Sequence, residues 1–153
     1  MELTAVTMTL YAEQALADMR RSLNRLSDTT INLRPHGATT NSAAALIVHA
    51  CTAAKYWFGH IGLGQPMPRD RDAEFNASAT IAELNVLIDD TAAELRTLID
   101  AFVAGPTAGD HELRVFSPGG DTSDGSVALH ALQELFQHLG HLELTADALT
   151  NPS

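Results

Sequence analysis

Cysteine, positive charge and long hydrophobic runs are all scarce in this chain. Its single cysteine, Cys51, excludes an internal disulfide framework and a cysteine-rich metal site. Nine Lys and Arg residues stand against 19 Asp and Glu residues, so the formal net charge is -10. That balance argues against binding to nucleic acid or to an anionic membrane surface. No uncharged apolar run approaches the roughly 20 residues that a membrane-spanning helix needs.

The length and composition indicate one globular domain. The chain has 153 residues, of which 45% are hydrophobic and 18% are charged, so it can bury a core of its own. The acidic residues Glu2, Glu13 and Asp18 stand where a secretory signal would need a positive segment and then an apolar one. We therefore expect a single domain over residues 1–153 and a cytoplasmic location.

Four segments carry apolar residues at spacings of three and four, which predicts four α-helices. These segments cover residues 4–26, 42–60, 81–102 and 126–149. Thr80 and Glu83 have the spacing of a capping box at the start of the third segment, and Ser126 is the expected N-cap of the fourth. The connections between the segments are long, and residues 111–116 are a candidate for a short extended piece. We expect an all-α fold, a four-helix bundle in an up-down arrangement with long connecting loops.

Histidine is the unusual residue of this composition, with seven copies, three of them between residues 130 and 141. His130, Glu134 and His138 follow one another at spacings of four. Four residues turn a helix by about 400°, so neighbouring members of this stripe lie on nearly the same face. Glu134 and His138 can therefore point at one metal ion, whereas His130 is expected to lie too far from His138 to share it. His141 lies near the same face.

A third ligand would have to come from another helix, and His49 is the best candidate. It lies in the middle of the most apolar segment, where a neutral imidazole needs a hydrogen-bond partner or a metal ion. Helical bundles build metal sites from facing helices, and three protein ligands leave positions open for water or substrate. The competing interpretation is a hydrogen-bonded core histidine and a solvated Glu134. Cys51 faces roughly the opposite side of the same helix and is expected to be a small core residue.

Two stretches of the chain resemble the DinB superfamily of metal-binding four-helix bundles. One comprises Leu46-Ile-Val-His49-Ala-Cys-Thr-Ala-Ala-Lys-Tyr56-Trp57-Phe58 and the following segment from Pro68 to Phe75, and the other is the histidine stripe. The closer resemblance is to the actinobacterial branch related to mycothiol-dependent maleylpyruvate isomerases and S-transferases. The superfamily's last helix usually carries His-x-x-x-His and then Arg-Gly-Gln. Here Glu134 takes the place of the first His, as in those isomerases, and His138-Leu-Gly-His141 follows.

The resemblance implies that His49, Glu134 and His138 hold a divalent metal ion, with His141 as an alternative third ligand in place of Glu134. Zinc is the expected metal, and nickel, iron or manganese also suit two imidazoles and a carboxylate. A low-molecular-weight thiol such as mycothiol would bind to the metal as a thiolate and attack a small electrophilic substrate. The implied activity is that of a thiol-dependent S-transferase or isomerase.

Four further residues are candidates for binding the thiol or substrate or for catalysis. Tyr56 is a candidate to line the pocket, and Arg69 and Arg71 to bind an anionic part of the thiol or substrate. The alternative for the two arginines is a solvated surface run. His141 is the candidate catalytic residue, as a proton donor or as a residue that orients a ligand.

Two other functions are compatible with the same residues. One is a non-catalytic metal-binding bundle that acts in a stress response, and the other is a helical scaffold without a metal. A homodimer is possible in each case, because bundles with a broad apolar face often pair.

Overall fold

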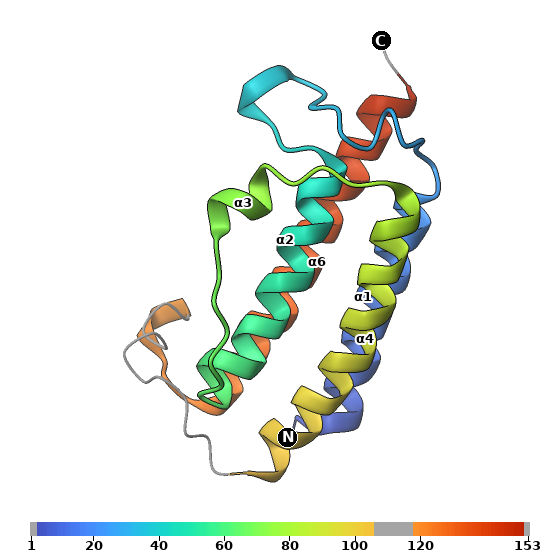
Figure 1. Cartoon of the computed structure of the whole chain (residues 1–153). Helices are drawn as coiled ribbons and strands as arrows, with labels where there is room; N and C mark the ends of the chain where they lie inside the picture. The colour runs from blue at the N-terminus through green and yellow to red at the C-terminus, as the bar shows by residue number, and fades with distance from the viewer. Residues whose placement is uncertain (1–2, 106–117, 152–153) are drawn as a thin grey trace.

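The computed structural model describes residues 3–105 and 118–151, and the regular elements in these ranges are all helical (Figure 1). The predicted all-α class is therefore confirmed. The long helices are α1 (Ala5–Leu23), α2 (Ala43–Tyr56), α4 (Ile81–Ala104) and α6 (Asp124–Thr150). The short ones are α3 (Arg71–Phe75), a π-helical turn (Trp57–Gly62) and two single 3-10 turns (Gly37–Thr39 and Pro118–Gly120). The extended piece expected at residues 111–116 lies outside the described residues.

The four long helices lie side by side, and each packs against two of the others. Helix α1 contacts α4 and α6, and α2 contacts the same two helices. Figure 1 shows α1 and α6 running in one direction and α2 and α4 in the other. The rings of Phe58, just after α2, and Phe102, at the end of α4, accordingly meet with 5.5 Å between their centroids.

The alternating direction of an up-down bundle is not seen in Figure 1, because α2 and α4 run the same way. The chain returns between them along the outside of the molecule, and α3 lies on this return path (Figure 1). A connection of this length permits a crossover that a tight turn would forbid. The crossover matters for the site, because it carries α3 across the face of α2.

The helix starts follow the expected chemistry with one difference. The capping box of α4 is confirmed: the backbone N–H of Glu83 donates to Thr80 Oγ1 at 3.2 Å, and the Glu83 carboxylate accepts from the backbone N–H of Thr80 at 2.8 Å. Helix α6 is capped by Ser123 instead of Ser126, because the Ser123 hydroxyl accepts from the backbone N–H of Ser126. Helix α6 thus begins two residues earlier than the apolar pattern indicated.

Helix α2 is buried nearly all round, as its composition indicated. Its core-facing residues are mostly alanines, whose small side chains let α4 and α6 approach closely. Besides the N-cap Ser42, His49 is the polar exception among its buried residues. None of the described helices combines the length and hydrophobicity that crossing a bilayer takes.

The end of α2 is irregular, since it continues as a π-helical turn where an α-helix to His60 was expected. Gly62 closes this turn against Phe102, and a Cβ atom at residue 62 would lie 2.6 Å from the Phe102 ring. Trp57 and Ile61 of this π-helical turn line a pocket beside His49. π-Helical turns are rare and are often found at functional sites.

Replacing Gly62 by Ala should destabilise the fold, and replacing Gly140 by Ala should stabilise it. The first substitution forces a methyl group into the Phe102 ring and should cost about 1–3 kcal/mol. The second lies in the middle of α6 with nothing within 4 Å of the new methyl group, and should add about 0.5–1 kcal/mol. Urea unfolding followed by circular dichroism measures both. Equal effects of the two substitutions would contradict this packing of the π-helical turn.

Cys51 should be inert toward thiol reagents in the folded protein. Its side chain is fully buried, and this burial raises the pKa of the thiol to about 11. The unfolded chain therefore forms the thiolate first as the pH rises, so the fold should lose stability above the ordinary thiol pKa of about 8.5. At mildly alkaline pH we expect modification on the order of 100-fold slower in the native protein than in denaturant. Immediate reaction of the native protein would show that Cys51 is not a core residue.

Candidate metal centre

His49 projects from the middle of α2, and its imidazole is only 2% exposed. Its Nδ1 atom lies 2.7 Å from Glu74 Oε2, and its ring stacks on the ring of Phe75 with 4.2 Å between centroids. Both partners belong to α3. The imidazole is therefore held from the α3 side, and its Nε2 atom faces α6.

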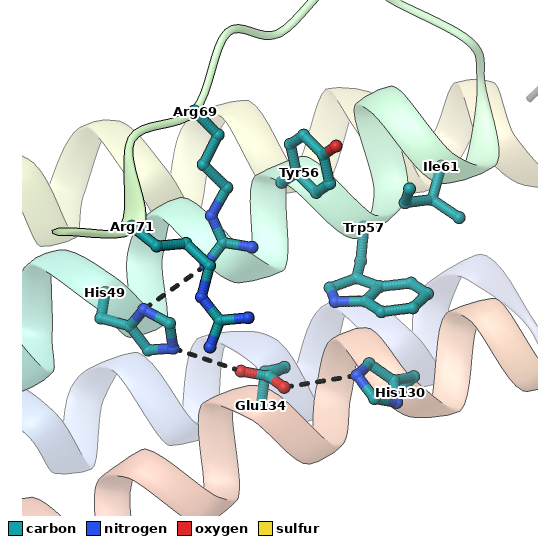
Figure 2. A pocket seen from close by; sticks show the side chains of 8 residues that line it. All are labelled: His49, Tyr56, Trp57, Ile61, Arg69, Arg71, His130 and Glu134. Carbon is teal, nitrogen blue, oxygen red and sulfur yellow. Dashed lines mark hydrogen bonds and ion pairs between the residues drawn. The ribbon is translucent and has the colours of Figure 1, made fainter. Parts of the chain in front are cut away.

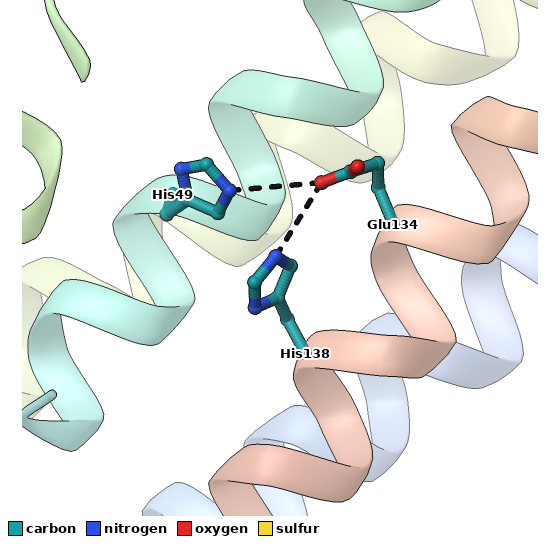
Figure 3. A group of neighbouring side chains, drawn as sticks. All are labelled: His49, Glu134 and His138. Carbon is teal, nitrogen blue, oxygen red and sulfur yellow. Dashed lines mark ion pairs between the residues drawn. The ribbon is translucent and has the colours of Figure 1, made fainter. Parts of the chain in front are cut away.

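Helix α6 presents Glu134 and His138 to that nitrogen. The Glu134 Oε2 atom lies 3.6 Å from His49 Nε2 and 3.4 Å from His138 Nε2. Figure 3 shows the two imidazoles on different helices with the carboxylate between them. One donor atom from each of the three side chains lies within 4.8 Å of the other two. The convergence predicted from two remote stretches of the sequence is thus present.

The spacing of these atoms fits a metal ion better than it fits direct hydrogen bonds. At 3.4–3.6 Å both contacts exceed the usual length of a hydrogen bond. Two donors that each lie about 2.1 Å from a tetrahedral zinc ion are about 3.4 Å apart. Two imidazoles and a carboxylate form a donor set that proteins use for catalytic zinc, with a further position left open.

The electrostatics of the centre favour an ionised carboxylate. Contacts with the imidazoles of His138 and then His49 hold the pKa of the Glu134 carboxyl well below its usual range, although its partial burial acts in the opposite direction. The carboxylate is therefore charged throughout the neutral range. The Glu134 carboxyl therefore has no proton to lose before it binds a cation at neutral pH.

A pocket of about 490 Å³ opens beside the centre (Figure 2). Such a volume suits a small molecule. Its apolar wall is formed by Tyr56, Trp57 and Ile61 at the end of α2 and in the π-helical turn. Its polar wall includes His49, Glu134 and side chains from the 69–71 segment and from α6. A ligand in this pocket would lie against two of the three donor residues.

The three residues predicted to bind a thiol or substrate all line this pocket, but their surroundings differ. Arg69 is mostly buried and bound to Glu74, with its guanidinium carbon 5.2 Å from the centroid of the Tyr56 ring. Arg71 is exposed and forms no ion pair within the described residues. Arg71 is thus the more available cation for an anionic ligand.

His141 lies outside the three-donor group and outside the pocket lining. It is exposed, and partial burial together with the nearby His138 lowers the pKa of its imidazole. It follows His138 by one helical turn on the side away from His130, whereas the pocket extends toward His130. The structure therefore places His141 neither as the third ligand nor beside the pocket.

Two residues beside the centre were not predicted to line the pocket or to contact a ligand residue. His130 lines the pocket with its Nε2 atom 3.3 Å from Glu134 Oε1, and its ring lies 3.9 Å from the Trp57 ring. It is not part of the three-donor group, which agrees with the prediction that it does not share the ion. Glu74 was not assigned a role, because α3 was not predicted. The sequence signal for α3 is weak. It consists of Asp70 as an N-cap residue and of two acidic residues, Asp72 and Glu74, in the first turn.

Comparison with known protein families finds a match to the DinB superfamily over residues 11–142, which covers most of the chain and all three donor residues. No curated protein and no solved structure matches the chain. The chain belongs to the DinB superfamily.

Proposed function

We propose that this protein is a thiol-dependent S-transferase of the mycothiol-related type, built on a four-helix bundle. It would hold a divalent ion through His49, Glu134 and His138 and act on a small electrophile. The observation that carries the proposal is the convergence of three donor atoms within 4.8 Å at the wall of a pocket of about 490 Å³. Glu134 in the place of the superfamily's usual histidine supports the mycothiol-related branch.

The ion would supply one kind of chemistry, since a divalent cation lowers the pKa of a thiol bound to it. The residues of the chain would supply the walls of the pocket and the charges around the ion and the ligand. Trp57 and Ile61 cover the apolar side of the pocket and keep water from it. Arg71 offers a charge to a carboxylate on the thiol or the electrophile. Glu134 keeps its own charge and so offsets part of the charge of the ion.

Replacing His49 or His138 by Ala should abolish binding of one zinc ion per chain, whereas replacing His130 by Ala should change it little. The first two residues each supply one of three donors, whereas His130 is outside the donor group and lies beside the other oxygen of Glu134. Metal content of protein purified without an affinity tag, together with zinc titration by calorimetry, measures this. Circular dichroism verifies that each variant is folded. Equal losses in all three variants, or a metal content that His49→Ala leaves unchanged, would refute the assignment.

The catalytic claim is tested with the zinc-loaded protein, several thiols and a panel of small electrophiles. We expect conjugation with mycothiol that is faster than with cysteine or glutathione, and that is lost in His138→Ala. A protein that binds zinc but conjugates none of the thiols would instead be a metal-binding member without transferase activity.

Replacing Arg71 by Gln should raise the KM for an acidic substrate or thiol by roughly 3- to 10-fold and leave kcat nearly unchanged. The side chain lines the pocket and is not one of the three donor residues. The control is Arg21→Gln, which removes an arginine that pairs with Asp18 on the surface of α1. A KM that Arg71→Gln leaves unchanged would show that Arg71 belongs to a solvated surface run.

A further inference from the structure

We propose that Glu74 is a positioning residue that holds the proton of His49 on Nδ1 and directs the free Nε2 lone pair at Glu134 and His138. The consequence for metal affinity rests on the proposed metal site, whereas the role of Glu74 toward the His49 ring does not. Glu74 lies in a helix of five residues on the crossover between α2 and α4.

The carboxylate of Glu74 is buried, with its side chain only 6% exposed. A buried carboxylate is costly unless charged or donor groups surround it. Arg69 donates from Nε to Oε1 at 2.8 Å and from Nη2 to Oε2 at 3.0 Å, which is a two-point pair. His49 Nδ1 lies 2.7 Å from Oε2. The buried charge is therefore matched by Arg69, and His49 is its third contact.

The chemistry of these groups decides which nitrogen of His49 carries the proton. An ionised carboxylate can only accept, so a lone pair on Nδ1 would face Oε2 at 2.7 Å and repel it. Arg69 Nη2 is also within 3.4 Å of Nδ1, but this donor is closer to Oε2 and is satisfied there. A proton on Nδ1 makes the contact with Oε2 a hydrogen bond between a donor and an acceptor. A neutral imidazole then has its lone pair on Nε2, the nitrogen that faces Glu134.

The rest of α3 holds the ring in the same orientation. Phe75 stacks on the face of the imidazole, with an angle of 27° between the rings. The segment itself is anchored at both ends: Asp70 caps the start by accepting from the backbone N–H of Ala73, and Arg34 donates to the backbone carbonyl of Phe75 at 3.0 Å. The hydrogen bond to Glu74 thus restricts rotation of the His49 imidazole within its own plane. The stacked Phe75 ring restricts its tilt.

A ligand that is oriented in advance loses less freedom when it binds an ion, and a carboxylate on its second nitrogen makes the imidazole a stronger donor. Removing such a carboxylate typically weakens metal binding by about 10- to 100-fold. The competing explanation is that Glu74 only neutralises Arg69. That explanation predicts a change in stability but none in the His49 proton or in the ligand field of a bound metal.

The first test needs no metal. Long-range ¹H–¹⁵N spectra of the metal-free protein, recorded about two pH units above the ordinary imidazole pKa, show which nitrogen of a neutral histidine is protonated. We expect His49 to carry its proton on Nδ1 in the wild-type protein, and the share of this form to fall in Glu74→Gln. The control Asp72→Asn removes the same charge from an exposed position of α3. It should leave the share of His49 that is protonated on Nδ1 unchanged. A proton on Nε2 in the wild-type protein overturns the proposal, even where Glu74→Gln fails to fold.

The second test is zinc titration, together with the visible spectrum of the cobalt-substituted protein. We expect Glu74→Gln to lose about 10- to 100-fold in zinc affinity and to shift the cobalt bands, and Asp72→Asn to do neither. Unchanged affinity and bands in a folded Glu74→Gln variant would contradict the role of Glu74. A wild-type protein that binds no zinc would overturn the proposed function, and the proton on His49 would still decide the role of Glu74.

Discussion

A polar ring buried in the middle of an apolar helix is the constraint on which the centre of this molecule depends. The imidazole of His49 is almost fully buried, so its nitrogens need partners within the protein, on a bound ion or in the adjoining pocket. One nitrogen meets Glu74 on α3, and the other faces Glu134 on α6. The packing of α2 between these two elements therefore serves a chemical need as well as a hydrophobic one.

The donor atoms stand on long helices, and this gives the centre its rigidity. The spacing of four residues brings Glu134 and His138 onto one face of α6, and the small side chains of α2 let the two helices approach closely. The pocket is built differently, from the π-helical turn and the crossover segment that carries Arg69 and Arg71. A rigid group of donor residues beside a wall of irregular segments is an arrangement in which ligand preference can change while the donor group stays the same.

The sequence predicted those features that follow from local rules. The helical segments, the capping box at Thr80 and the pairing of Glu134 with His138 all depend on helical periodicity or on neighbours within one turn. His49 was found because a histidine is conspicuous in an apolar helix, although its distance from α6 depends on how the two helices pack. The parallel course of α2 and α4 and the position of Glu74 depend on the crossover, which no periodic pattern describes. His141 shares the helical face of His138 but lies one turn beyond it, and angular position alone did not show that the pocket extends the other way.

The central claim is that one divalent cation binds between α2 and α6. It is tested most directly by an anomalous-difference map from crystals of protein purified without an affinity tag and grown with zinc, with data collected on both sides of the zinc absorption edge. We predict a single strong peak within bonding distance of His49 Nε2, His138 Nε2 and one Glu134 oxygen. A peak elsewhere, or no peak at this position in a zinc-saturated crystal, would contradict it.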